Sequence, residues 1–410
     1  MLTVIEQEPN NAMHFNLLGY IYIKLQNPQK AKIFFLKAYE LNSEVPEICN
    51  NLGNIILQID QNYLVAAEYF SKAIKLKPNF VDAYNNLATA MLKLSNMKKA
   101  IHIIEIALQI KPNYILALNN YGKMLFFLMQ SNKAKEIFHK VLTIDENNSE
   151  ALSYLGEIYC EKYQYDLGID FLNKSLSISH DFNIYYKLGY IYLDQKKYEL
   201  AEKNLKKYLE NDPQSLMAIG KLCYCYLSIG RWQSLSKYKN DAVKIIKNKK
   251  QFSPALPFYS HLIFHDAELQ LINNKKWCEV LSKNIEQHKF TFKNSPGKKI
   301  KVGYISPHFS IHPVGILLDG LFKYHNKERF TTYCIATVAH ETEIYQNISQ
   351  SCDYVVERTI ETPFEFAQKI YSLNLDILVD FAGDTTELNF HILKYQPTRI
   401  QCHLLGCICT

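Results

Sequence analysis

The chain has 410 residues, of which 48% are hydrophobic and 21% charged, and its formal net charge is +6. This length predicts two or three domains, and the composition is ordinary for a globular protein. No apolar run reaches the roughly 18–20 residues that span a bilayer, and the first ten residues lack the regions of a signal peptide, so we expect a cytoplasmic protein with no membrane partner.

The distribution of charge argues against a nucleic-acid-binding protein, and the cysteine spacing argues against a zinc site. Positive residues are spread along the chain, with one short cluster at Lys247–Lys250, so no nucleic-acid partner is expected. None of the ten cysteines has zinc-site spacing. We expect most of them to be buried, reduced thiols and predict no metal site; Cys407 and Cys409 lie near the end, where they are more accessible.

Internal periodicity is the strongest signal along the chain. A small residue flanked by apolar ones recurs every 33 to 35 residues. These positions are Gly19, Gly53, Ala88, Gly122, Gly156, Gly189 and, less clearly, Cys223. In most units a second small residue, such as Ala31 or Ala66, follows the first by 12 or 13 residues. A large apolar residue, such as Phe35 or Phe70, comes four positions after that second small residue.

The period and these positions match the tetratricopeptide repeat, a helix–turn–helix unit. Small residues let the two helices approach, large apolar residues fill the space between them, and prolines such as Pro78 and Pro112 end a unit. Six repeats and a decayed seventh are expected to stack into a superhelix over residues 1–240. Met1–Asn10 resembles the second helix of an earlier repeat.

Three asparagines occur in phase on the helix expected to line the concave face: Asn51, Asn86 and Asn120. An amide both donates and accepts, so a ladder of amides can pair with an extended peptide backbone without reading its side chains. Alternatively, asparagine is only a tolerated surface residue here, and the ladder stops at Tyr154 and Lys187. We expect the three amides to point inward in a row and to bind acceptor proteins or extended peptides.

The 34-residue pattern ends after the repeats. Residues 241–297 are expected to form a helical linker, in which the two prolines of 252–258 break the pattern, helical spacing resumes at 261–290 and 294–297 is a turn. From residue 298, strand and helix patterns alternate, which predicts parallel βαβ units of a partial Rossmann-like lobe over 298–410. Expected strands are 300–305, 331–337, 353–356, 376–381 and 400–405, and expected helices are 314–325, 341–350, 363–373 and 386–394. No nucleotide-phosphate loop motif occurs in this segment.

The loop after the first expected strand is the main candidate for chemistry. It runs from Ser306 to Pro313 and carries His308 and His312. Open α/β sheets place their ligands at such carboxyl ends of strands. A neutral imidazole there can accept a proton from a hydroxyl or orient it, whereas the plainer interpretation is a histidine that only hydrogen-bonds the backbone.

The order of motifs resembles the O-linked N-acetylglucosamine transferase (SPINDLY-like) family. The motifs are the repeats followed by Lys299–Ser306, Phe309-x-x-His312-Pro313, Arg329-Phe330, Asp376–Thr385, Gln396–Gln401 and Leu405-Gly406. The resemblance implies a two-lobed GT-B fold, of which residues 298–410 are an incomplete N-terminal lobe. It further implies transfer of N-acetylglucosamine from UDP-N-acetylglucosamine to Ser or Thr of proteins held by the repeats, without a metal, and a catalytic acid/base position at His312.

Some residues depart from the family's pattern. His308 replaces an acid, Gly383-Asp384-Thr385 varies a glycine–aromatic–threonine or glycine–histidine–threonine element, and Leu404–Thr410 varies a longer motif. In this family the second lobe grips UDP, and the sequence to Thr410 does not include it. We therefore expect a truncated chain that transfers no sugar by itself. The alternative is a repeat scaffold that binds peptides and carries a vestigial α/β tail; the oligomeric state stays open.

Overall fold

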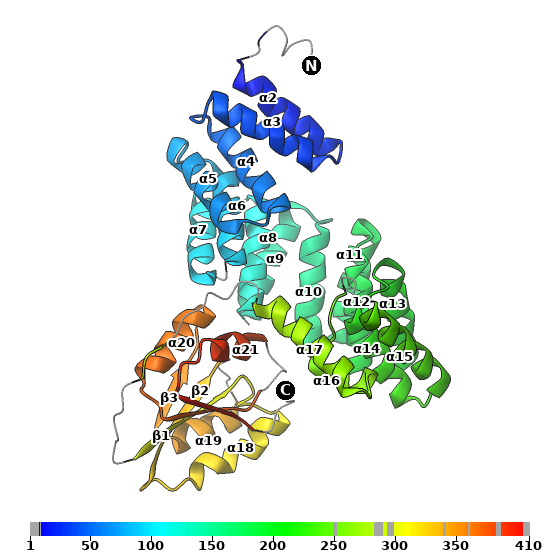
Figure 1. The fold of residues 1–410 in the computed structure, drawn as a ribbon, viewed down its shortest axis with the longest axis vertical. Helices are drawn as coiled ribbons and strands as arrows, with labels where there is room; N and C mark the ends of the chain where they lie inside the picture. Colours follow the sequence, from blue (N-terminus) through cyan, green and yellow to red (C-terminus); the bar gives the residue numbers. More distant parts are fainter. Residues whose placement is uncertain are drawn as a thin grey trace. The chain divides into compact units, whose positions relative to one another are not determined.

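The computed structural model describes residues 8, 10–94, 96–128, 130–248, 252–282, 290–292, 299–338, 342–359, 361–382 and 387–404 (Figure 1). It contains two compact units, one up to Ala151 and one from Leu152. The predicted class is confirmed, since helix pairs precede a five-stranded parallel sheet. The helix expected at Met1–Asn10 lies outside the described residues apart from Glu8 and Asn10, and so does the turn expected at 294–297.

The first unit consists of antiparallel helix pairs with the predicted repeat. Its helices are α2 (Ala12–Lys24), α3 (Pro28–Leu41), α4 (Pro46–Ile59), α5 (Tyr63–Leu76), α6 (Val81–Lys93), α7 (Met97–Ile110), α8 (Ile115–Phe127) and α9 (Ser131–Ile144). Helix α10 (Ser149–Glu161) crosses the boundary between the units. The even-numbered helix of each pair is the first helix of its repeat.

The periodic small and large residues meet inside each repeat. A Cβ atom on Gly53 would lie only 2.7 Å from the ring of Phe70, which is fully buried. The glycine therefore lets the two helices of the pair approach until the aromatic ring lies against backbone. This is the packing that the sequence pattern predicts.

Asparagine also recurs at the start of the second helix of the first three repeats. The side chain of Asn62 accepts a hydrogen bond from the backbone N–H of Val65 at 3.2 Å. Asn27 and Asn96 cap α3 and α7 in the same way. Part of the chain's asparagine content thus satisfies helix N-termini.

The second unit begins with further repeat helices and continues into the linker. Its helices before the sheet are α11 (Tyr165–Ser179), α12 (Asn183–Asp194), α13 (Tyr198–Asn211), α14 (Leu216–Ser228), α15 (Trp232–Lys247), α16 (Pro257–Ile263) and α17 (Ala267–Ser282). Helix α16 starts at the second proline of the 252–258 segment, earlier than the sequence pattern indicated. Proline fits the first position of a helix because its missing N–H would have no partner there.

The sheet follows with the strand order β3-β2-β1-β4-β5, and all neighbouring strands are parallel. The elements are β1 (Ile300–Ser306), α18 (Pro313–Lys323), β2 (Phe330–Ala336), α19 (Glu343–Ser351), β3 (Tyr354–Glu357), α20 (Pro363–Ser372), β4 (Ile377–Asp380), α21 (Glu387–Lys394) and β5 (Ile400–His403). All five strands and four helices agree with the predicted ones to within a few residues.

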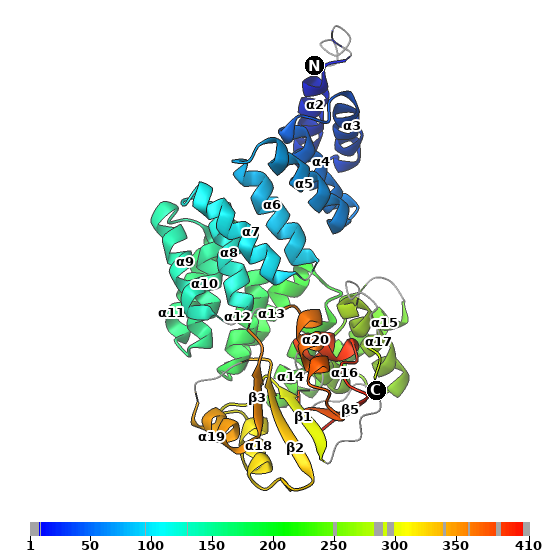
Figure 2. The same ribbon diagram turned by 90° about the vertical axis from the view of Figure 1, so that its left-hand side faces the viewer.

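Helices cover both faces of this sheet (Figures 1 and 2). On one face, Tyr304 of β1 packs in a buried cluster with Phe322 of α18 and Ile348 of α19. On the other face, Ile305 packs with Ile370 of α20 and Ile392 of α21. Adjacent residues of β1 therefore enter different cores, which explains why residues 302–306 of this strand are all buried.

Candidate functional site

The candidate site lies at the carboxyl edge of the parallel sheet. The chain steps from β1 outward to β2 and β3, and then returns to the opposite side of β1 to form β4 and β5. The strand order thus reverses between β1 and β4, and open α/β sheets bind ligands in the crevice at that point. The loop after β1, with His308 and His312, begins at this edge.

The backbone of the β1 loop is pressed against the first turn of α18. A Cβ atom on Gly315 would lie 2.2 Å from the carbonyl oxygen of Ser310 and 2.6 Å from that of His308. The His308 backbone N–H also donates to the Ser306 hydroxyl at 3.0 Å. The loop is therefore fixed from both ends, and it holds the two imidazole rings stacked with their centroids 4.1 Å apart.

His312 caps α18. Its Nδ1 atom accepts a hydrogen bond from the backbone N–H of Val314 at 3.2 Å, and burial lowers the pKa of the ring. A neutral imidazole has one proton, so that proton is on Nε2 while Nδ1 accepts. In this state His312 offers a hydrogen-bond donor at Nε2, because its unprotonated Nδ1 atom already accepts the Val314 N–H of the helix.

A buried polar network at the same edge was not predicted from the sequence. Asp380 ends β4, and its Oδ1 atom accepts from Asn389 Nδ2 at 2.9 Å and from the Ala382 N–H at 3.0 Å. Its Oδ2 atom lies 3.1 Å from Nδ1 of His403 at the end of β5. Thr337, just after β2, donates its hydroxyl proton to Asn389 Oδ1 at 3.0 Å.

This network gives His403 the opposite tautomer from His312. A carboxylate only accepts, so Nδ1 of His403 carries the proton toward Asp380 and the lone pair of the neutral ring is on Nε2. Asp380 and His403 lie near the carboxyl ends of the expected strands 376–381 and 400–405, and this position could have indicated them. Asn389, within a helix, had no such signal.

The three asparagines of the expected ladder each make a contact between repeats. Each second-position amide donates to an asparagine three residues before the small residue of the preceding repeat. The pairs are Asn51 with Asn16 (3.0 Å), Asn86 with Asn50 (2.9 Å) and Asn120 with Asn85 (2.8 Å). The acceptors are buried and the donors are partly exposed, so each amide already has one partner inside the protein.

An open groove of about 740 Å³ lies over the first helices of four consecutive repeats in the first unit, α2, α4, α6 and the start of α8. Asn51 and Asn86 line it, whereas Asn120 is not among its lining residues. Tyr20, Phe80 and Tyr114 add aromatic surface. The groove therefore combines amide groups with aromatic rings.

The pairing between repeats continues in the second unit with other residue types. Lys187 occupies the position of the ladder amides, and its Nζ atom donates to the Ser153 hydroxyl at 2.8 Å. Lys221 is next in phase, and its Nζ atom lies 5.6 Å from the ring centroid of Tyr186. Where the amide ladder ends, the geometry between repeats is thus kept by lysines.

Other sequence predictions lie beyond what the structure describes, among them Gly383-Asp384-Thr385 and the segment Leu405–Thr410. Within the described ranges, no three His, Cys, Asp or Glu side chains gather as a metal ion would need. Every helix in the same ranges is too short or too polar to cross a lipid bilayer.

Comparison with known proteins finds matches to both parts of the chain. Residues 264–410 match the model of glycosyl transferase family 41, and residues 15–45, 69–102 and 182–215 match tetratricopeptide repeat models. The resemblance to the O-linked N-acetylglucosamine transferases seen in the sequence is confirmed.

Two curated relatives align over 189 residues, 43% of this chain. The Arabidopsis thaliana protein, described as a probable UDP-N-acetylglucosamine–peptide N-acetylglucosaminyltransferase SEC, is 26% identical, and the Caenorhabditis elegans UDP-N-acetylglucosamine–peptide N-acetylglucosaminyltransferase is 24% identical. The alignments span only 19% and 16% of these relatives. A solved structure of a Thermobaculum terrenum O-GlcNAc transferase mutant shares the fold, with a TM-score of 0.50 and 18% identity over 71% of this chain and 50% of that one.

Proposed function

We propose that this chain, whose residues 264–410 belong to glycosyl transferase family 41 behind tetratricopeptide repeats, functions as a protein O-glycosyltransferase. The repeats bind the acceptor polypeptide, and the carboxyl edge of the sheet forms one wall of the active site. The donor is UDP-N-acetylglucosamine, the acceptor is a Ser or Thr hydroxyl, and no metal takes part. The observation that carries this function is the family match, over the segment that contains the histidine loop at the strand-order reversal.

His312 has an orienting role in this function. Its Nδ1 atom is engaged by the Val314 N–H, so Nε2–H donates a hydrogen bond to an oxygen of the acceptor or of the sugar nucleotide. Removal of the hydroxyl proton is assigned to His403, whose ring Asp380 orients through Nδ1–H. Both roles belong to the proposed reaction.

The acceptor lies along the first helices of the repeats. The groove lined by Asn51 and Asn86 supports this placement, because amides and aromatic rings bind an extended chain through its backbone and its apolar side chains. Each amide keeps a second N–H for such a contact after donating to its neighbour. We place this protein in the cytoplasm and expect no nucleic-acid partner.

Residues 1–410 alone are proposed to bind acceptors without transferring sugar. The described residues hold one parallel sheet, whereas GT-B chemistry takes place between two lobes and the second lobe grips UDP. A second candidate function is therefore that of a peptide-binding repeat scaffold, which the groove in the first unit favours.

Binding and transfer experiments separate these functions. Calorimetry with UDP and with extended Ser/Thr peptides, and transfer of labelled N-acetylglucosamine to the same peptides, are measured for residues 1–410 and for the product of the whole reading frame. Peptide binding by both, with transfer only by a longer product, supports the enzyme. UDP binding by residues 1–410 contradicts their proposed inactivity. Peptide binding without transfer by any product leaves the scaffold function.

A further inference from the structure

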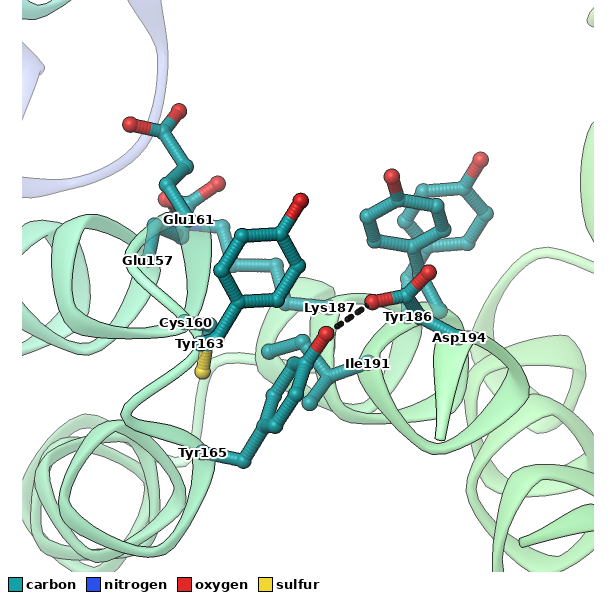
Figure 3. A pocket seen from close by; sticks show the side chains of 10 residues that line it. Glu157, Cys160, Glu161, Tyr163, Tyr165, Tyr186, Lys187, Ile191 and Asp194 are labelled. Atoms are coloured by element: carbon teal, nitrogen blue, oxygen red, sulfur yellow. Dashed lines mark hydrogen bonds and ion pairs between the residues drawn. The ribbon is translucent and has the colours of Figure 1, made fainter. Parts of the chain in front are cut away.

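The charged side chain of Arg358, the residue that follows β3, has no partner in the part of the chain that the structure describes. Its Nε atom is buried without a hydrogen bond, and no carboxylate of the described ranges lies within ion-pair distance of the guanidinium. Other charged groups of the second unit do have partners: Lys187 pairs with Glu157 at 2.6 Å, and Asp194 accepts from the Tyr165 hydroxyl (Figure 3). An unpaired charge away from water is costly, so the guanidinium favours an anion that comes from outside these residues.

Arg358 lies at the carboxyl edge of the sheet. Its backbone N–H donates to the Ala336 carbonyl oxygen at 2.9 Å, which continues the β2–β3 pairing by one step. Val356 packs in the buried cluster that contains α20, and the Glu357 carboxylate bonds Tyr345 of α19 on the other face. Side chains alternate along a strand, so the Arg358 side chain is on the α20 face.

The carboxylate that acts electrostatically on Arg358 is already engaged elsewhere. Burial lowers the pKa of the Arg358 guanidinium, and the charge of Glu361 opposes that shift. Glu361 itself pairs with Lys369 at 2.8 Å and accepts from the Thr359 N–H at 2.6 Å. The guanidinium therefore keeps its donors, and their planar fork fits the two oxygens of a carboxylate or a phosphate.

The position of Arg358 distinguishes the two anions of the proposed reaction, which are the donor's phosphates and acidic side chains of the acceptor. Four strand spacings of about 4.8 Å separate β3 from β5, so Arg358 is attached roughly 19 Å from the strand of His403, the proposed base. The donor's phosphate is bonded to the sugar carbon that the hydroxyl attacks, so it must lie within roughly 8 Å of that base. The phosphates are therefore too far from Arg358, whereas an extended polypeptide covers this distance with about six residues.

We propose that Arg358 pairs with the carboxylate of an acidic residue of the acceptor polypeptide, about six residues from the hydroxyl that receives the sugar. The proposal rests on the proposed function and adds a sequence preference to it. The acceptor's carboxylate compensates a charge that the folded chain leaves unpaired, so the pair gains more than one formed with an exposed lysine. A lysine or arginine at the same place in the acceptor is disfavoured by repulsion.

The test uses two labelled extended peptides with a single Thr. They differ only at the positions about six residues before and after that Thr, which are Glu in one peptide and Gln in the other. Fluorescence anisotropy measures their binding to residues 1–410. The Glu peptide is expected to bind about fivefold or more tightly, and Arg358→Met should abolish this ratio without weakening the Gln peptide.

The matched control is Arg329→Met, which removes an exposed arginine at the opposite edge of the same sheet, just before β2. It should keep the full preference for Glu. A second measurement tests whether Arg358 has only a structural role. Methionine retains an apolar stem, so Arg358→Met should leave the Tm unchanged or raise it, because an unpaired buried charge is lost.

Three outcomes would overturn the role of Arg358. Equal binding of both peptides to the unchanged protein does so and leaves peptide binding intact, and so does a Glu preference that survives Arg358→Met. A Tm lowered by Arg358→Met shows that the guanidinium stabilises the fold, which removes the reason for an external anion. Binding of neither peptide overturns the polypeptide-binding part of the proposed function, and the preference with it.

Discussion

At the scale of single residues, two histidines at one sheet edge have different chemistry because their Nδ1 atoms have different partners. His312 accepts from a backbone N–H of its own helix, whereas His403 donates to the carboxylate of Asp380. The sequence pattern indicated His312, and not His403, as the expected acid/base position. The direction of the hydrogen bond decides which ring can take a proton at Nε2.

The cap formed by His312 should depend on pH. The pKa of His312 is lowered from 6.5 in the folded chain, so the unfolded chain binds more protons between the two pKa values. The stabilisation is therefore complete above about pH 6.5 and is lost as pH falls through the folded pKa. Amide exchange at Val314, corrected for intrinsic rates, should accelerate more between pH 7.5 and 5 than at other α18 amides.

Two substitutions separate capping from chemistry at this position. His312→Ala removes the cap and should cost about 1 kcal/mol of local stability at pH 7.5, whereas His312→Asn supplies a side-chain oxygen and should recover most of it. His312→Asn should also remove the pH dependence at Val314. An unchanged dependence in His312→Asn would show that another group titrates there.

At the scale of elements, each repeat is held by a small residue facing a large one. Gly53 faces Phe70, and where the small residue is Ala88 the large one is Ile104. Glycine faces Phe in three repeats and Leu in two, since Gly156 faces Leu172 and Gly189 faces Leu205. Close packing thus sets the large side chain together with its surroundings in each repeat.

This complementarity predicts energetic coupling. Gly53→Ala alone forces the Phe70 ring to move and should cost about 1–3 kcal/mol. Phe70→Ile alone leaves a cavity and should cost about 1–2 kcal/mol. The double variant copies the Ala88–Ile104 pair, so its cost should fall below the sum by about 1 kcal/mol or more in hydrogen-exchange measurements. Gly53→Ala combined with Phe138→Ile, in another repeat, should show no such coupling.

At the scale of the whole molecule, the chain contains two compact units with separate cores, and the polar network of the sheet lies in the second. Asn389 of α21 is buried and bonds both Thr337 and Asp380, so its side chain connects the ends of β2 and β4. A substitution in this network and a substitution in a repeat core therefore change contacts with different residues.

Stability losses caused by substitutions in the two units should therefore add. Asn389→Leu leaves the Thr337 hydroxyl without its partner and removes one donor from Asp380, so it should cost about 2–3 kcal/mol in the second unit. Combined with Gly53→Ala, the losses should add to within about 0.5 kcal/mol, each confined to the exchange rates of its own unit. The surface variant Gln346→Ala should change stability by less than about 0.5 kcal/mol. Loss of protection in the first unit on Asn389→Leu would contradict independence.

The sequence by itself determined the repeat length, the helix pairs, the five strands and the histidine loop. These features depend on local periodicity, glycine and proline positions and β-branched runs, which act within a few tens of residues. It also indicated that Asn51 and Asn86 lie on the first helices of their repeats. It could not indicate that these amides donate to Asn16 and Asn50, because that partner choice depends on how neighbouring repeats pack.

Only the tertiary structure decided the chemistry at the sheet edge. Asp380, Asn389 and His403 meet because parallel strands place their carboxyl ends at one edge, while helix α21 returns a side chain to it. Glu157 and Lys187 form an ion pair because two repeats stack. The direction of a hydrogen bond and the partner of a charged group depend on such long-range contacts, and no local pattern carries them.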